Sequence, residues 1–289
     1  MGQRLPSMLP DLSDRQWLWC AAGFYTAGLL LGTVSLVRGQ RTSGILIYCA
    51  ILAGYVLQFI GLGVRGRAAG GCPLGNQFEI FQFTAWSAIT LYLVVGVTFR
   101  SSLLGFFTSC LGAALTVVSL SIPAWDAVRR THIFGGNPWI ELHAALAIFS
   151  YGVFGLLALT SGLFLLRHFS LKSKRLGGWF SFLPSILELD HIEVRLLAAG
   201  FGLLTLALVF GSVYWSRDTA TVDHAKLAAT VAVWAAAAAA LGLRAVGRLL
   251  ARRFAWTCLA LFAAALLSLE AVDESRHPRV SPPAEKAAP

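Results

Sequence analysis

The chain has 289 residues, of which 57% are hydrophobic and only 13% charged, and its mean hydropathy is +0.70. Soluble domains carry about 25% charged residues, so this composition excludes a disordered protein, a coiled coil and nearly all soluble enzymes. The formal net charge of +9 does not indicate nucleic-acid binding, because the basic residues stand between long apolar runs and not on one folded face. The lipid bilayer is therefore the expected surrounding of most of the chain.

Eight apolar stretches free of Asp, Glu, Lys and Arg are each close to the roughly 20 residues that a transmembrane helix needs. In chain order they lie between Arg15 and Arg38, Arg41 and Arg65, Glu79 and Arg100, Arg100 and Asp126, Glu141 and Arg167, Arg195 and Arg217, Lys226 and Arg244, and Arg253 and Glu270. We therefore expect an all-α, polytopic integral membrane protein with eight transmembrane helices over residues 1–272. The composition of residues 273–289 predicts a disordered tail. The longest interior loop is expected from His168 to about Arg195, with His191 inside it.

The basic residues of the loops predict the orientation of the chain in the membrane. With eight spans both termini share one side, which carries 8 Lys and Arg residues when the tail is omitted, against 12 on the other side. The second side also clusters its charge, as in Arg252-Arg253. Since Lys and Arg are enriched in cytoplasmic loops, we expect both termini outside, with the protein in the inner (plasma) membrane of the cell.

Two histidines are expected at matching depth on the outer side of the membrane. His143 falls in the first turn of the fifth predicted helix, and His224 begins the seventh. Imidazoles on two helices can hold a metal between them, and neutral imidazole is a common axial ligand of haem iron. Trp139, Tyr151 and Trp215 are candidate aromatic walls of such a site. The alternative for each histidine alone is a place at the membrane interface, and for each tryptophan a place in the aromatic belt.

Other polar residues carry weaker signals. Glu79 opens the third predicted helix, where a carboxylate suits the positive helix end or pairs with a basic group of a loop or ligand. The sequence contains no Walker A loop, HExxH, GxSxG or CxxC, so the enzyme classes with those motifs are not indicated. At mid-membrane, scattered Ser and Thr and Gln58 give a small-solute permease little support.

Four stretches carry a family pattern in a fixed order. They are Cys72-Pro-Leu-Gly-Asn-Gln-Phe-Glu79 continuing to Trp86, Trp139-Ile-Glu-Leu-His143 continuing to Tyr151, Leu183-Pro-Ser-Ile-Leu-Glu188-Leu-Asp190, and Gly211-Ser-Val-Tyr-Trp215 followed by Asp223 and Lys226. Together they resemble the CcsA/ResC and HemX type of cytochrome c assembly (cytochrome c biogenesis) membrane protein. The resemblance covers roughly residues 45–270.

The resemblance implies a haem-handling site at the outer face. His143 stands in the place of an external histidine of the family, Trp215 in that of its Trp-rich loop, and Asp223 with Lys226 in that of an Asp-Pro-Lys-Glu element. Its implied cofactor is haem b, and its implied partners are apocytochrome c and another cytochrome c assembly subunit. His224 takes the place of the family's Pro, so a ligand role for it rests on its position alone.

Two departures from the CcsA type favour the HemX-like branch. The Trp-rich loop is reduced to Tyr214-Trp215, and Gly242-Leu243-Arg244 stands where CcsA-type proteins carry His before Leu-Arg. We expect a membrane protein that binds or relays haem in cytochrome c assembly, with no independent enzymatic activity and at most a part in a haem-attachment system. The alternatives are a regulatory or scaffold membrane protein without bound haem and, less favoured, a small-solute permease.

Overall fold

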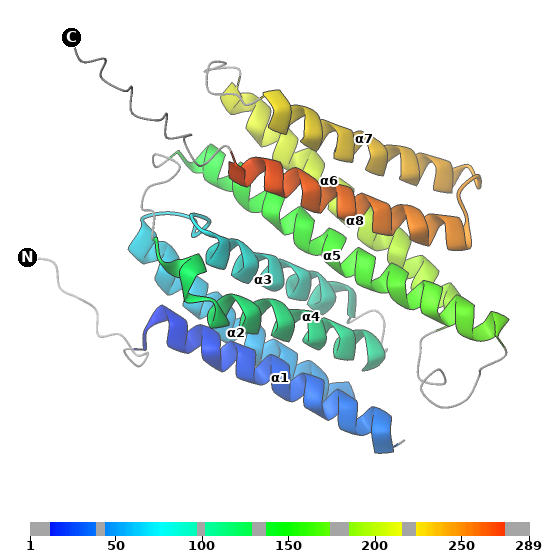
Figure 1. Ribbon diagram of the computed structural model, residues 1–289, viewed down its shortest axis with the longest axis horizontal. Coiled ribbons are helices and arrows are strands. Elements are labelled where there is room, and N and C mark those ends of the chain that lie inside the picture. Colours follow the sequence, from blue (N-terminus) through cyan, green and yellow to red (C-terminus); the bar gives the residue numbers. More distant parts are fainter. Residues whose placement is uncertain are drawn as a thin grey trace, which may run out of the picture.

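The computed structural model describes residues 12–38, 44–96, 102–128, 137–173, 185–215 and 224–274, and all regular structure in these ranges is helical. Eight α-helices and one 3-10 turn follow one another along the chain (Figure 1). They are α1 (Asp14–Arg38), α2 (Gly44–Ala69), α3 (Gln77–Gly96), α4 (Ser102–Ser121), η1 (Pro123–Asp126), α5 (Pro138–Lys172), α6 (Ile186–Trp215), α7 (His224–Ala245) and α8 (Ala251–Glu274).

Among the residues that the structure describes, six helices are long and apolar enough to cross a bilayer: α1, α2, α5, α6, α7 and α8. The first turns of α3 contain Gln77, Glu79 and Gln82, which lower its hydropathy, and the part of α4 whose side chains are described is the shorter apolar segment Gly105–Ser121. The prediction of an all-helical, multi-pass membrane protein is confirmed. Eight helices are present among the described residues, but spanning length and composition are confirmed for six of them.

The prediction of a long interior loop is wrong at both of its ends. α5 continues to Lys172 and α6 begins at Ile186, so His191 lies in the first turns of a helix. The first turns of α6 carry charged side chains, and one of them, Asp190, forms an ion pair with Arg244 at the end of α7. The predicted tail lies outside the described residues, apart from its first two positions, which end α8.

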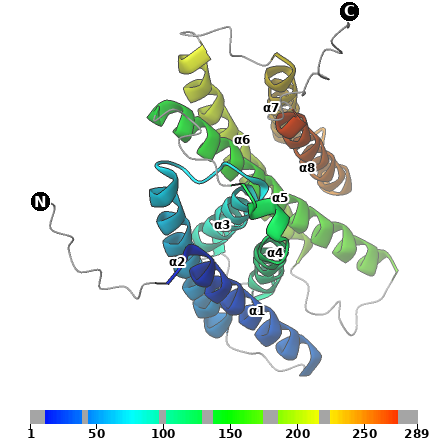
Figure 2. The same cartoon turned by 60° about the vertical axis from the view of Figure 1, so that its left-hand side comes forward.

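The helices form two groups of four that α5 connects. α1 packs on α2 and α4, α3 packs on α4, and in the second group α5 packs on α6 and α8, while α7 packs on α8. The groups meet chiefly where α3 contacts α5, and Figure 2 shows α5 lying between them. Gly152 permits this approach, because a Cβ there would overlap Ser87 Oγ and lie 2.7 Å from the carbonyl oxygen of Thr84.

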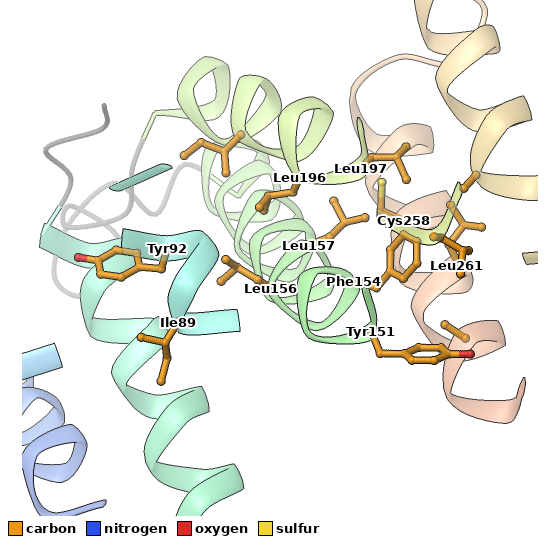
Figure 3. Packing of buried hydrophobic residues seen from close by; sticks show 14 of the residues in the cluster. Ile89, Tyr92, Tyr151, Phe154, Leu156, Leu157, Leu196, Leu197, Cys258 and Leu261 are labelled. Carbon is orange, nitrogen blue, oxygen red and sulfur yellow. The ribbon is translucent and has the colours of Figure 1, made fainter. Parts of the chain in front are cut away.

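The hydrophobic core continues through this junction. Figure 3 shows Leu156 directed towards Ile89 and Tyr92 of the first group, while Phe154 is directed towards Cys258 and Leu261 of α8. The side chains of Leu156 and Phe154 are each only 1% exposed. One helix thus buries two opposite faces, which explains why α5 is apolar all round rather than amphipathic.

Candidate functional site

The N-terminal turns of α5 place His143. Asn137 caps the helix, its side-chain oxygen accepting a hydrogen bond from the Trp139 N–H at 3.1 Å, and Pro138 occupies the first helical position. Both residues are typical of a helix start. His143 follows in the second turn and lies against the C-terminal half of α6.

The imidazole of His143 is held by a backbone carbonyl. Its Nδ1 lies 2.6 Å from the carbonyl oxygen of Ala207. A carbonyl oxygen can only accept, so Nδ1 carries the proton and Nε2 of the neutral ring keeps its lone pair. Histidines that bind metals typically donate their other N–H to a carbonyl or carboxylate in this way. With this geometry, Nε2 of His143 is suited to act as a ligand of iron.

Three residues of α6 at four-residue spacing face this imidazole: Ala207, Gly211 and Trp215. Side chains at such spacing share one face of a helix. A Cβ at Gly211 would lie 2.7 Å from His143 Nδ1, so only glycine lets the ring approach α6 this closely. The indole of Trp215 meets the imidazole edge to face, with ring centroids 5.6 Å apart. The ring is thus fixed on the α6 side by three contacts.

The other predicted site residues divide into two groups. Trp139, one turn before His143, stacks on Phe210 of α6 with ring centroids 5.7 Å apart, so it belongs to the same α5–α6 contact. Tyr151 is two turns deeper, about 12 Å along the helix at 1.5 Å per residue. Its hydroxyl lies 2.9 Å from Ser268 Oγ of α8, which makes it a packing contact between helices rather than a neighbour of His143.

The start of α7 carries the second predicted ligand. His224 is its first residue and is exposed. Within the described residues no hydrogen bond or ring contact joins His224 to His143. Asp223 lies outside the described residues, and for Lys226 the structure describes the place in α7 but not the side chain.

Glu79 lies in a buried ion network of the first helix group, at the end of the bundle that carries His143. Its Oε1 is 2.5 Å from Arg65 Nε, and its Oε2 accepts a hydrogen bond from the Gly75 N–H at 2.5 Å. Arg65 also pairs with Asp14 at 2.8 Å and with Asp126, and its side chain is only 1% exposed. Arg65 therefore connects α1, α2, α3 and η1, a role that its position at the end of an apolar stretch did not reveal.

A second polar chain continues inward from this network. The Tyr25 hydroxyl donates to Gln58 Oε1 at 2.8 Å, Gln58 Nε2 donates to Gln82 Oε1 at 2.8 Å, and Gln82 Nε2 donates to Ser119 Oγ at 2.8 Å. The two glutamine side chains are fully buried. The side-chain amides of Gln58 and Gln82 hydrogen-bond to each other, so this series of hydrogen bonds joins α1, α2, α3 and α4 as a structural contact. It gives no support to a permease.

Trp86 is placed in an aromatic cluster of α2, α3 and α5. It stacks on Tyr55 at 5.4 Å and on Phe59 at 5.9 Å between ring centroids, and meets Phe149 edge to face at 6.0 Å. Phe149 lies on α5 six residues after His143. Trp86 thus supports the junction of the two helix groups and has no ring contact with His143 within the described residues.

The loop before α3 is joined to the start of α5. The Cys72 N–H donates to Glu141 Oε2 at 3.3 Å, and Glu141 precedes His143 by two residues. Burial, with the nearby carboxylates of Glu141 and Glu79, raises the pKa of the Cys72 thiol to about 12. Two of the sequence stretches with a family pattern, 72–86 and 139–151, therefore meet at the end of the bundle that carries His143.

Comparison with known proteins decides the family. The chain matches the family model described as "Cytochrome C assembly protein" over residues 74–271, which is more than half of its length. The chain belongs to the cytochrome c assembly protein family. The match begins in the loop before α3 and ends within α8, so it includes Glu79, His143, Trp215 and His224.

Named relatives of this chain come from both branches of the resemblance. It is 26% identical to "Protein HemX" of Bacillus subtilis over 193 residues, covering 66% of this chain and 69% of that protein. It is also 26% identical to "Protein HemX" of Brevibacillus brevis over 207 residues, covering 71% and 75%. With "Cytochrome c biogenesis protein CcsA" of Microcystis aeruginosa the identity is 23% over 248 residues, covering 67% and 74%.

Proposed function

We propose that this protein binds or relays haem at the outer face of the membrane during cytochrome c assembly. The observation that carries the proposal is the fixed imidazole of His143, whose Nδ1 donates to the Ala207 carbonyl so that Nε2 is available to iron. Family membership supports the setting, and Trp215 and Trp139 supply flat apolar surface beside that imidazole. Haem b is the proposed form, because the chain offers non-covalent ligation and no CxxCH attachment motif.

The residues have separate roles in this proposal. His143 ligates the iron of the haem, and Gly211 and Ala207 orient the imidazole through the close approach and the carbonyl contact. His224, at the start of α7, is the proposed second ligand, with Asp223 and Lys226 beside it in sequence. The iron supplies redox chemistry and the porphyrin vinyl groups are the sites to which a cysteine can add. This chain contributes binding and presentation, and apocytochrome c with another assembly subunit are the proposed partners.

We also propose that the site faces the outside of the inner (plasma) membrane. The loops at the His143 end carry fewer Lys and Arg residues than those at the other end when the C-terminal tail is omitted. With an even number of spans both termini lie on the side of His143. That placement would bring haem to the compartment where an external apocytochrome could reach it.

Deletion of the gene in its own cell tests the function. The proposal predicts a loss of haem-stained c-type cytochromes, restored by the wild-type chain and not by His143→Ala, while His168→Ala, at the other end of α5, restores them fully. Normal cytochrome levels in the deletion strain would instead favour a regulatory or scaffold protein without bound haem. The similarity to proteins named HemX is the reason for retaining this second candidate function.

A further inference from the structure

The turn between α7 and α8 forms a surface pocket of about 610 Å³. It lies at the end of the bundle opposite His143, because α6 runs from Asp190 at this end to Trp215 beside His143 (Figure 1). The residues that line it are Arg248, Leu250, Ala251, Arg252, Arg253 and Trp256. Nothing in the proposed haem function uses this pocket.

The pocket concentrates positive charge that the described part of the chain does not neutralise. Arg248, Arg252 and Arg253 are exposed, and none of them forms an ion pair with a described acidic residue. The neighbouring Arg244 differs, since it pairs with Asp190. Arg252 and Arg253 also stand in the first turn of α8, which has no acidic residue. Cations are unfavourable at this positive end of the helix, so an anion bound there would offset the repulsion.

Apolar groups stand directly beside these arginines. Trp256 follows Arg252 by four residues, so the two side chains share one face of α8. Trp256 is 55% exposed and Leu250 is 53% exposed. Tryptophan is enriched at the head-group level of bilayers, where one part of the ring contacts lipid chains and the N–H contacts polar groups. The pocket thus offers charge to a head group and apolar surface to acyl chains.

Backbone hydrogen bonds hold the turn in one conformation. Gly247 has a φ of +71°, and the Arg248 N–H donates to the Leu243 carbonyl at 2.9 Å. A glycine in the left-handed region followed by such a bond is a common way to end a helix. Because the backbone around Arg248 is fixed, the three guanidinium groups are presented from a defined surface rather than from an unstructured tail.

We propose that this turn binds the phosphodiester head group of an anionic phospholipid, with Arg248, Arg252 and Arg253 around the phosphate and Trp256 and Leu250 against the acyl chains. Guanidinium groups pair with phosphate oxygens through two parallel hydrogen bonds. Basic pockets between transmembrane helices bind anionic lipid head groups by this chemistry. A free phosphate would use the arginines alone, so the apolar part of the pocket assigns the ligand as a lipid.

Native mass spectrometry of the full-length protein, with phosphatidylglycerol and phosphatidylcholine in competition, tests the proposal. The wild-type chain is expected to retain phosphatidylglycerol preferentially. Each of Arg248→Gln, Arg252→Gln and Arg253→Gln is expected to lower this retention about fivefold, the effect of one basic residue beside an anionic surface. The triple Gln variant should show no preference, while the triple Lys variant, which keeps the charge, should retain part of it.

Lys172→Gln, an exposed change at the same end but outside the pocket, is the matched control and should leave the preference unchanged. The melting temperature of each variant without added lipid checks that it folds. Equal phosphatidylglycerol retention by the wild-type and triple Gln proteins would overturn the proposal. Displacement of the lipid by millimolar inorganic phosphate, or full retention by Trp256→Ala, would overturn the assignment to lipid.

Discussion

The Nδ1 atom of His143 lies 2.6 Å from the carbonyl oxygen of Ala207, and the two residues belong to different helices, α5 and α6. This bond fixes the tautomer and the direction of the imidazole before any ligand arrives. A haem ligand that is already oriented loses less freedom on binding than one that must be ordered at that moment. The contact therefore gives a physical reason for choosing His143 over the other histidines of the described chain.

Gly211→Ala tests whether the α6 surface orients this histidine. The new methyl group would lie 2.7 Å from Nδ1 and 2.9 Å from Cε1 of His143, so the ring must move. We expect haem affinity to fall about 10-fold to 100-fold, the usual effect of disturbing a residue that orients a ligand. Haem titration followed by absorption measures the change.

Gly202→Ala is the matched control for that variant. It lies on the same helix, and a Cβ there would meet nothing within 4 Å. The substitution should leave haem affinity unchanged and slightly stabilise α6, since alanine is the better helix former. Equal losses of affinity in the two variants would contradict a role for the Gly211–His143 contact.

Arg65→Gln tests the buried ion network. The substitution removes the buried charge that pairs with Glu79 and Asp14, while Asp126 keeps its ion pair with Arg15, so we expect the free energy of unfolding to fall by about 3–5 kcal/mol. Thermal unfolding in detergent measures it. Arg67→Gln, an exposed change on the same helix, should alter stability by less than about 0.5 kcal/mol. Similar melting temperatures for the two variants would mean that the network contributes nothing.

Gly152→Ala tests the junction between the two helix groups. The added methyl group would overlap Ser87 Oγ and lie 2.7 Å from the Thr84 carbonyl oxygen, which belongs to the backbone and cannot rotate away. We expect a loss of about 3 kcal/mol, the upper part of the range for overpacking. Gly162→Ala, on the same helix with open space around it, should cost nothing. A stable Gly152→Ala protein would show that α3 and α5 are not in this close contact.

Cys72 gives a pH-dependent prediction outside the membrane spans. Burial, Glu141 and Glu79 raise the pKa of its thiol to about 12, so the reactive thiolate is a minor form at neutral pH. In a protein whose other four cysteines are replaced by alanine, the iodoacetamide reaction rate should rise about tenfold per pH unit up to pH ~9.5, without the plateau of an ordinary thiol. Glu141→Gln removes a negative charge, lowers the pKa and should speed labelling at pH 8. A rate that levels off between pH ~8.5 and pH ~9.5, as for a thiol with the ordinary pKa of about 8.5, would contradict this environment.

The sequence predicted the helices well because their signal is local. Charged residues bound each apolar stretch, and Glu141 at the start of the fifth stretch indicated that His143 lies near the beginning of α5. The family pattern placed His143 and Trp215 in one site, and the structure brings their rings together. Ala207 and Gly211 could not be singled out as neighbours of His143, because small residues carry no chemical signal and the contact joins positions 64 residues apart.

Charged residues were the harder part to predict. Arg65 stands at the border of an apolar stretch, where a charge usually marks a solvated loop, yet its side chain is buried and paired. Its partners Asp14, Glu79 and Asp126 come from three other elements, so no local pattern could predict the network. For Tyr151 the local pattern was misleading. Its spacing puts it on the same helix face as His143, but its hydroxyl contacts Ser268 of α8. Helical spacing gives a face and does not give the depth of a site.

The most direct test of the haem proposal is the absorption spectrum of the purified protein before and after added haem. The account predicts a Soret band in the wild-type protein that His143→Ala greatly weakens and His224→Ala weakens less. His132→Ala and His168→Ala, as control variants, should leave it unchanged. Absence of a Soret band even with added haem, or a band of equal strength in His143→Ala, would contradict the central claim that His143 binds haem.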